Sequence, residues 1–138
     1  MLHVLKLTLI LGAFISQSLF AQENSTLVVE FETIQNQSGT LYVGIFQENN
    51  FLKQPLAGQT VAVNASSHSV KFENLKQGQY AVSVFQDLNE NQKMDFETNG
   101  MPTEPWAMSG DLNPGSPPAW NEVSFQLSEE DKVVKLKI

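Results

Sequence analysis

The sequence predicts an all-β fold, an antiparallel sandwich of two sheets with about seven short strands and one long irregular loop. From Ser25 onward the apolar residues recur with period two, the pattern of strands that bury one face. These apolar segments follow one another at intervals of about ten residues, and turn-forming residues separate them. No window in this part of the chain has the 3.6-residue period of an amphipathic helix. An up-and-down barrel is the chief alternative.

Each expected strand places alternate apolar residues on one face. In chain order these residues are Leu27, Val29 and Phe31; Leu41, Val43 and Ile45; Val61 and Val63; Val70 and Phe72; Tyr80, Val82 and Val84; Val123, Phe125 and Leu127; and Val134, Leu136 and Ile138. The turn-forming residues 36–39 predict that the first two strands form a hairpin. Residues 49–53 fit either one helical turn or a short edge strand. Lys135 and Lys137 alternate with the apolar residues of the last strand, which indicates a solvated face.

The first 21 residues have the features of a secretory signal peptide. Lys6 precedes an apolar run from Leu7 to Ile15, and Ala21 ends the segment. The run is shorter than the roughly 20 residues that a membrane-spanning helix needs, so we expect no integral span after signal removal. The alternatives are an N-terminal core helix or a retained anchor. We therefore expect one exported domain, residues 22–138, that is periplasmic or secreted.

The composition excludes several classes of function. Removing residues 1–21 leaves 117 residues with 7 lysines, no arginine and 15 acids, a net charge of −8. This charge argues against nucleic acid as a partner, because binding it requires clustered basic residues that displace counterions from phosphates. The absence of cysteine excludes disulfides, thiolate nucleophiles and zinc sites built on cysteine.

One segment interrupts the strand pattern. Residues 87–121 hold five of the six prolines, three of the four methionines and both tryptophans, with almost no strand periodicity. Loops of this length are uncommon in compact domains and are usually functional, held by a metal or disordered. The aromatic and methionine content argues against disorder.

The start of this segment predicts a site for a hard cation such as calcium. Oxygen-bearing side chains stand at every second position from Asp87, and calcium prefers oxygen ligands in this kind of spacing. Gln92 and Thr98 stand where an EF-hand loop has glycine and a bidentate glutamate, so acids further along must complete the shell. The candidate ligands are Asp87, Asn89, Asn91, the Lys93 carbonyl, Asp95, Glu97 and Glu104. With two carboxylates certain, we expect weak affinity, about 10⁻⁴–10⁻³ M.

The same spacing has a second interpretation without any metal. Asp87, Asn89 and Asn91 can form successive Asx-turns, in which each side chain accepts a hydrogen bond from the backbone two residues on. The sequence alone leaves both interpretations open.

Four motifs in fixed order carry a resemblance to a known family. They are Gly78-Gln79-Tyr80-Ala81, the Asp87–Asp95 turn, Asn99-Gly100-Met101-Pro102-Thr103-Glu104-Pro105-Trp106, and Pro117-Pro118-Ala119-Trp120. In these motifs the chain resembles the bacterial exported family called domain of unknown function 2141. The resemblance implies an immunoglobulin-like or prealbumin-like (transthyretin-like) sandwich and an exported protein. It implies no function.

The sequence does not indicate an enzyme. The mature chain has His68 as its single histidine and no G-x-S-x-G motif, so a nucleophile beside a base is not indicated. We therefore expect an exported non-catalytic protein with a calcium-stabilised loop. The alternative is a carbohydrate- or peptide-binding module in which Trp106, Trp120 and Tyr42 form an aromatic platform. Tryptophans that only close the open end of the sandwich are the competing interpretation.

Overall fold

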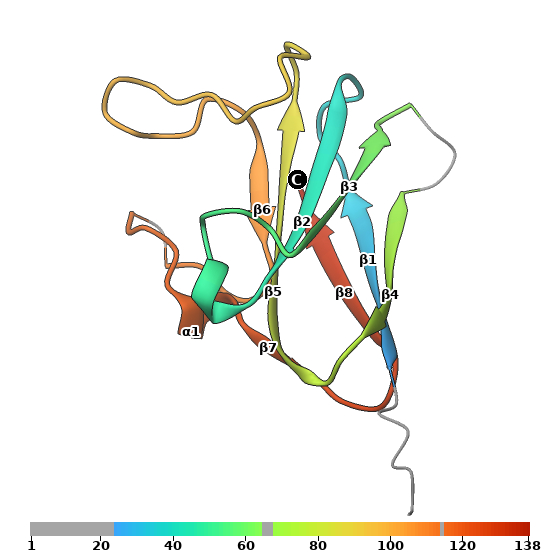
Figure 1. Ribbon diagram of the computed structural model, residues 1–138. Coiled ribbons are helices and arrows are strands. Elements are labelled where there is room, and N and C mark those ends of the chain that lie inside the picture. The colour runs from blue at the N-terminus through green and yellow to red at the C-terminus, as the bar shows by residue number, and fades with distance from the viewer. Residues whose placement is uncertain (1–23, 65–67, 114) are drawn as a thin grey trace, which may run out of the picture.

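The chain forms two β-sheets packed face to face (Figure 1). The computed structural model describes residues 24–64, 68–113 and 115–138, so the predicted signal peptide lies outside the described residues. The strands are β1 (Ser25–Thr33), β2 (Thr40–Phe46), β3 (Ala57–Ala62), β4 (Ser69–Leu75), β5 (Gly78–Asp87), β6 (Trp106–Met108), β7 (Phe125–Leu127) and β8 (Lys132–Lys137). A 3₁₀ turn, η1 (Glu48–Asn50), and a four-residue helix, α1 (Trp120–Val123), complete the described elements. The predicted two-sheet sandwich is confirmed.

The smaller sheet has the strand order β4-β1-β8. β4 is antiparallel to β1, whereas β8 runs parallel to it, with Val29 opposite Val134. On the outer face, the carboxylate oxygens of Glu32 lie 3.7 Å from Nζ of Lys135 and 3.9 Å from Nζ of Lys137. Both lysines are exposed, which confirms the predicted solvated face of the last strand. Ion pairs this exposed contribute little to stability.

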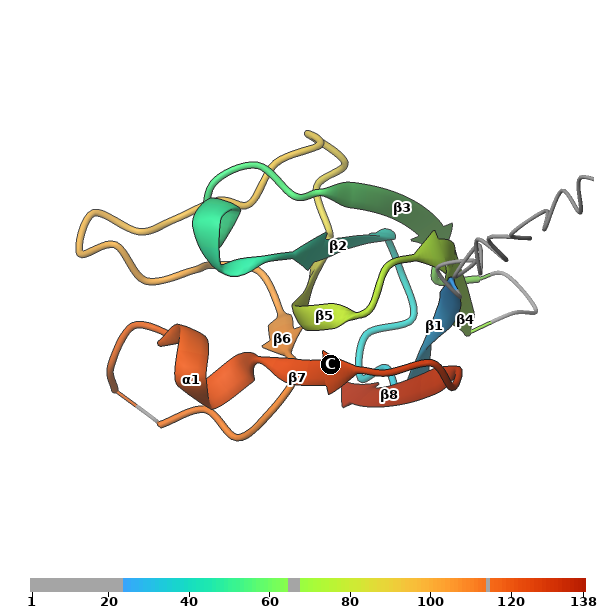
Figure 2. The same cartoon turned by 60° about the horizontal axis from the view of Figure 1, so that its bottom comes forward.

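The larger sheet has the order β3-β2-β5-β6, and β7 pairs with the first part of β5. All its pairs are antiparallel. Figure 2 shows this sheet lying over the smaller one, with η1 and α1 at one side of the sandwich. No helix among the described residues is long and apolar enough to cross a membrane.

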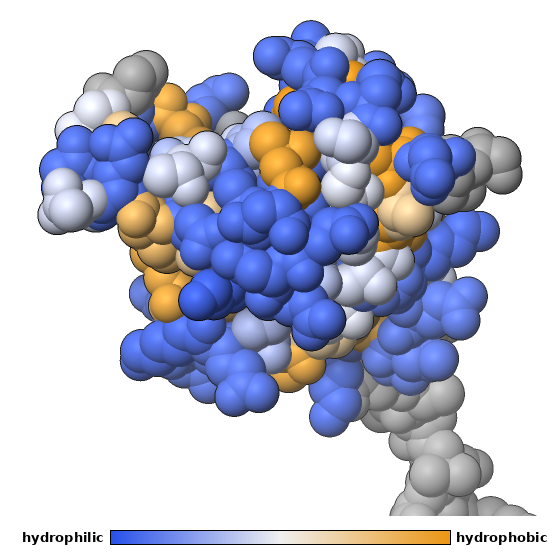
Figure 3. Space-filling view, turned by 90° about the horizontal axis from the view of Figure 1, so that it is seen from above, coloured by the Kyte–Doolittle hydropathy of each residue, from blue (hydrophilic) through white to orange (hydrophobic). Residues whose placement is uncertain are grey.

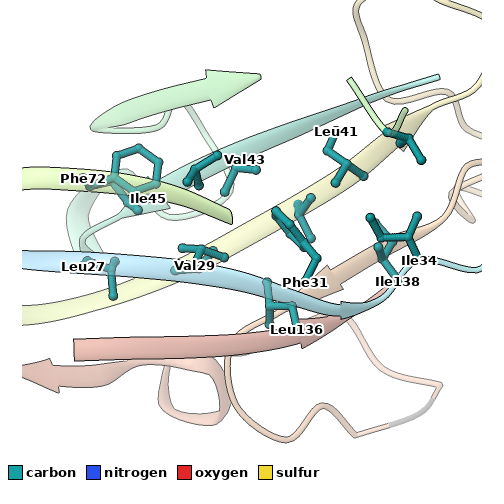
Figure 4. Packing of buried hydrophobic residues seen from close by; sticks show 14 residues of the cluster. Leu27, Val29, Phe31, Ile34, Leu41, Val43, Ile45, Phe72, Leu136 and Ile138 are labelled. Carbon is teal, nitrogen blue, oxygen red and sulfur yellow. The ribbon is translucent and has the colours of Figure 1, made fainter. Parts of the chain in front are cut away.

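The core fills the space between the two sheets (Figure 4). Most of the predicted inward residues are buried, and Leu27, Val29, Leu41, Ile45, Val82 and Val84 have no exposed surface. Val61, Phe125 and Val134 are partly buried and pack against this core. Period-two alternation therefore identified the buried faces, because successive side chains of a strand point to opposite sides of its sheet.

The predicted hairpin between the first two strands is wrong. β1 and β2 lie in different sheets, and neither pairs with the other. The N–H of Gln35 donates to the carbonyl of Ile138 at 2.8 Å, so the chain stays bound to the end of β8 before it crosses the sandwich. The buried amide of Gln86 then donates to the carbonyls of Asn36 and Ser38 at 2.7 and 2.6 Å. These hydrogen bonds hold residues 36–39 as a crossing between sheets.

Residues 87–121 are less irregular than predicted. They contain β6, and an isolated bridge joins Phe96 to Pro102 in a hairpin that projects from the upper end of the sandwich (Figure 1). The expected strand from Val123 is also shorter than predicted, because Val123 ends α1 and only residues 125–127 form β7. Residues 48–50 adopt the helical alternative rather than an edge strand.

Candidate functional site

The loop that follows β5 begins at a buried carboxylate. Asp87 is the last residue of β5 and has no exposed surface. Its two oxygens accept hydrogen bonds from the N–H groups of Asn91 at 3.2 Å and Gln92 at 2.7 Å. A buried carboxylate requires such partners, because desolvation without them is costly. Asp87 thus folds residues 88–92 back over the end of its own strand.

Asn89 and Asn91 form the successive Asx-turns that the spacing allowed. Oδ1 of Asn89 accepts from the N–H of Asn91, and Oδ1 of Asn91 accepts from the N–H of Lys93, both at 3.1 Å. Their amide groups both donate to Oδ2 of Asp95 at 2.7 Å. The side chains of one loop therefore converge on a single carboxylate oxygen.

Gln92 occupies the position that a calcium loop of the EF-hand type gives to glycine. Its φ of 68° lies in the left-handed region, where glycine is favoured, and Glu90 has a φ of 59°. The loop thus makes the sharp turn that this position requires without the residue best suited to it.

The hydrogen-bond network lowers the pKa of Asp95. The amide of Asn89 is the main cause; partial burial opposes it, and the Asn91 amide and the Lys93 charge act with it. The ionised form of Asp95 is therefore favoured by two neutral amide donors and by the charge of Lys93.

Glu104 closes the loop from the other end. It is 7% exposed; one carboxylate oxygen accepts from the N–H of Leu88 at 2.9 Å, and the other from the N–H of Asp95 at 3.4 Å. Glu104 is thus hydrogen-bonded to the backbone at both ends of the loop that holds Asn89, Asn91 and Asp95. The structure does not bring in Glu97, whose exposed side chain lies in the turn of the projecting hairpin.

The donor set has the chemistry of a calcium site but few carboxylates near one another. Within residues 24–64, 68–113 and 115–138, no three side chains among histidine, aspartate and glutamate gather closely enough to hold a metal. Calcium also accepts amide and backbone oxygens, of which the loop supplies several. Seen from this end, the surface is mostly hydrophilic, with small separate hydrophobic areas (Figure 3).

Two of the three aromatic candidates, Tyr42 and Trp106, lie in one cross-strand row. Tyr42 stacks on Phe85 of the neighbouring strand, with ring centroids 5.0 Å apart and planes 9° from parallel. Trp106 is the cross-strand partner of Phe85, so Tyr42, Phe85 and Trp106 form one row on the outer face of the larger sheet. Trp120 is not in this row; it makes an edge contact with Phe51, with ring centroids 5.4 Å apart, and packs against the same small cluster as Trp106.

Trp120 belongs to a small second core on the outer face of the larger sheet. Its members are the buried residues Ala81, Met108 and Val123 with the partly buried Phe51, Trp106, Leu112 and Trp120. The indole N–H of Trp120 is buried and has no hydrogen-bond partner among the described residues. This location agrees with the interpretation of Trp120 as a packing residue.

A groove of about 450 Å³ lies on the same face. The sequence did not predict it, and Tyr42 is the one candidate residue among those that line it. Phe85, Gly44, Gly58 and Lys53 are among its lining residues. One signal was available: Phe85 alternates with the apolar Val82 and Val84, so it stands on the solvent side of its strand. A large aromatic residue on that side indicates an apolar surface on this face.

Fold and site together define a class of protein, a two-sheet β-sandwich whose longest connection is tied to the end of a central strand by buried carboxylates. The chain belongs to the family described as uncharacterized protein conserved in bacteria (DUF2141), whose model matches residues 29–135. No curated protein and no solved structure matches the chain. The immunoglobulin-like or prealbumin-like subtype therefore stays a prediction.

Proposed function

We propose that this protein is an exported, non-catalytic β-sandwich module, periplasmic or secreted, whose loop after β5 is stabilised by calcium. The start of the sequence supports export. Family membership supplies no activity. The single histidine of residues 22–138, His68, is exposed just before β4, where a positioned catalytic base is not expected.

The observation that carries the calcium proposal is the convergence of Asn89 and Asn91 on Asp95 above the buried Asp87. Calcium would compete with the two Asn amide groups for the Asp95 carboxylate and would use the side-chain oxygens of the same loop. Because these hydrogen bonds already satisfy Asp95, cation binding has to replace them. Weak affinity, in the range expected from the sequence, follows from this competition.

Thermal unfolding with calcium and with a chelator tests this proposal. With a Kd of about 0.5 mM, about 5 mM calcium stabilises the folded state by about 1.4 kcal/mol. We expect Tm to rise by about 3–8 °C for a domain of this size. Asp95→Asn should remove the calcium effect, whereas Asp111→Asn, an exposed acid outside the loop, should retain it. Equal Tm values in calcium and chelator would exclude the site.

A second candidate function is ligand binding on the outer face of the larger sheet. The Tyr42–Phe85 stack and the groove beside it favour this function. Concave surfaces with aromatic walls and a few polar groups are the usual form of small-molecule sites. Titration of the protein with carbohydrates and peptides, followed by NMR, tests the function. Amide shifts at Tyr42 and Phe85 would support it, and their absence with both ligand classes would remove it.

A further inference from the structure

The groove is built by two neighbouring rows of cross-strand residues. In the first row Tyr42 lies between Thr60 and Phe85, and in the second Gly44 lies between Gly58 and Ser83. Both rows belong to the outer face, because Tyr42 and Gly44 alternate with the buried Leu41, Val43 and Ile45. A row of small residues thus runs beside a row that contains two aromatic rings, and this difference in size hollows the surface across three strands.

The two glycines have different surroundings. A Cβ at Gly44 would lie 3.1 Å from Cβ of Pro55 and 3.2 Å from Cε2 of Phe46. The side chains of Pro55 and Phe46 therefore stand close against the backbone at Gly44. A Cβ at Gly58 would meet only the carbonyl of Val43, at an ordinary 3.5 Å. The groove is therefore closed beside Phe46 and open at Gly58, toward the free edge of the sheet at β3.

Polar groups surround the aromatic wall. Among the hydrogen bonds between described residues, none engages the hydroxyls of Tyr42, Thr60 or Ser83. Lys53 also lines the groove, and its lining contains no acid. The volume of about 450 Å³ falls within the roughly 300–1,000 Å³ typical of small-molecule sites. The site thus offers an apolar wall together with hydroxyl and ammonium groups.

This combination suits a neutral saccharide better than a peptide or a polyanion. The rim of a sugar ring carries hydroxyls, and its C–H face packs against apolar surfaces. A peptide that adds a strand gains affinity from unpaired backbone groups at a sheet edge, whereas the groove crosses strands whose backbone ladders are already paired. The net charge of −8 opposes a polyanion.

We propose that the groove floored by Gly44, Gly58 and Ser83 and walled by Tyr42 and Phe85 binds a neutral saccharide. The proposal rests on the second candidate function, since it names the ligand class and the subsite of that face. The calcium loop has no part in it.

The test uses the full chain and follows ligand titrations by amide NMR. The probes are maltotetraose, cellotetraose, chitotetraose and, as the peptide control, tetra-alanine. We expect at least one tetrasaccharide to shift the amides of Gly44, Gly58 and Ser83 saturably. Gly100, which lies in the projecting hairpin, should not shift.

Gly58→Val places its Cβ at an ordinary contact distance from its surroundings and adds bulk at the open end of the groove, so it should weaken saccharide binding at least tenfold in a folded protein. Glu73→Val adds the same side chain to an exposed position of the other sheet and should leave binding unchanged. Binding that persists in Gly58→Val, or no saccharide shift at these amides, overturns the proposal. Shifts caused by tetra-alanine alone would uphold ligand binding at this face but overturn the saccharide assignment.

Discussion

Glu104 accepts a hydrogen bond from the backbone N–H of Leu88, 16 residues earlier in the chain, at 2.9 Å. The second oxygen of the same carboxylate accepts from the N–H of Asp95 at 3.4 Å. One buried side chain therefore holds both ends of the turn that contains the candidate calcium ligands. In a chain without cysteine, no disulfide can fasten this loop.

Replacement of Glu104 by glutamine should destabilise the fold. An amide retains one acceptor and presents an NH₂ group to the second N–H, so one buried hydrogen bond is lost. We expect the free energy of unfolding to fall by about 1–3 kcal/mol in urea titrations at neutral pH. Glu97→Gln changes the same charge at an exposed position and should stay within about 0.5 kcal/mol of the parent. Equal effects of the two variants would contradict the role of Glu104.

The lowered pKa of Asp95 predicts a stability change in acid. Because its folded-state pKa lies below its unfolded value of about 3.9, ionised Asp95 contributes stability that is fully present above that value. This contribution is lost as the pH falls through the folded-state pKa. Denaturant unfolding of the parent and of Asp95→Asn between neutral pH and about pH 2 checks it, and the variant should lose less stability below about pH 4. Parallel pH profiles would contradict the assigned hydrogen bonds.

Gln92→Gly should stabilise the protein. Gln92 has a φ of 68°, and a non-glycine residue in the left-handed region costs about 1 kcal/mol or more. Glycine removes this strain but loses more backbone entropy on folding, so we expect a net gain of a few tenths to about 1 kcal/mol. Gln79→Gly, within β5, should instead cost about 0.5–1 kcal/mol. Thermal unfolding of both variants should give shifts of opposite sign.

The buried faces of the strands were predictable from sequence because alternation is a local property. Leu27 and Val29, or Leu41 and Val43, are separated by one residue, and a strand turns both toward the same side. The Asx-turns at Asn89 and Asn91 were predictable for the same reason, since each hydrogen bond spans two residues.

Pairing between distant segments was not predictable in this way. The parallel pairing of Val29 with Val134 and the separation of β1 from β2 depend on contacts that no local pattern encodes. The groove has the same origin, because Gly58, Gly44 and Ser83 become neighbours only through the register of three strands. Glu104 was a candidate by charge alone, and the contact with Leu88 explains its position.

Replacement of Ser109 should weaken the second core, because its buried hydroxyl makes two hydrogen bonds there. Its hydroxyl donates to the carbonyl of Val123 at 2.7 Å and accepts from the N–H of Val82 at 2.9 Å, and the residue is 3% exposed. Ser109→Ala leaves both backbone groups buried without this partner, so we expect a loss of about 1–3 kcal/mol in the free energy of unfolding.

Ser116→Ala is the matched control, because its exposed hydroxyl makes one turn contact at 3.3 Å and should contribute less than about 0.5 kcal/mol. The hydroxyl of Ser109 joins α1 to β5, and Trp120 begins that helix. Its loss should therefore also shift the tryptophan emission of the native protein to longer wavelength as Trp120 gains solvent exposure. Unchanged stability together with unchanged emission would show that packing around Val123 holds α1 in place without the serine.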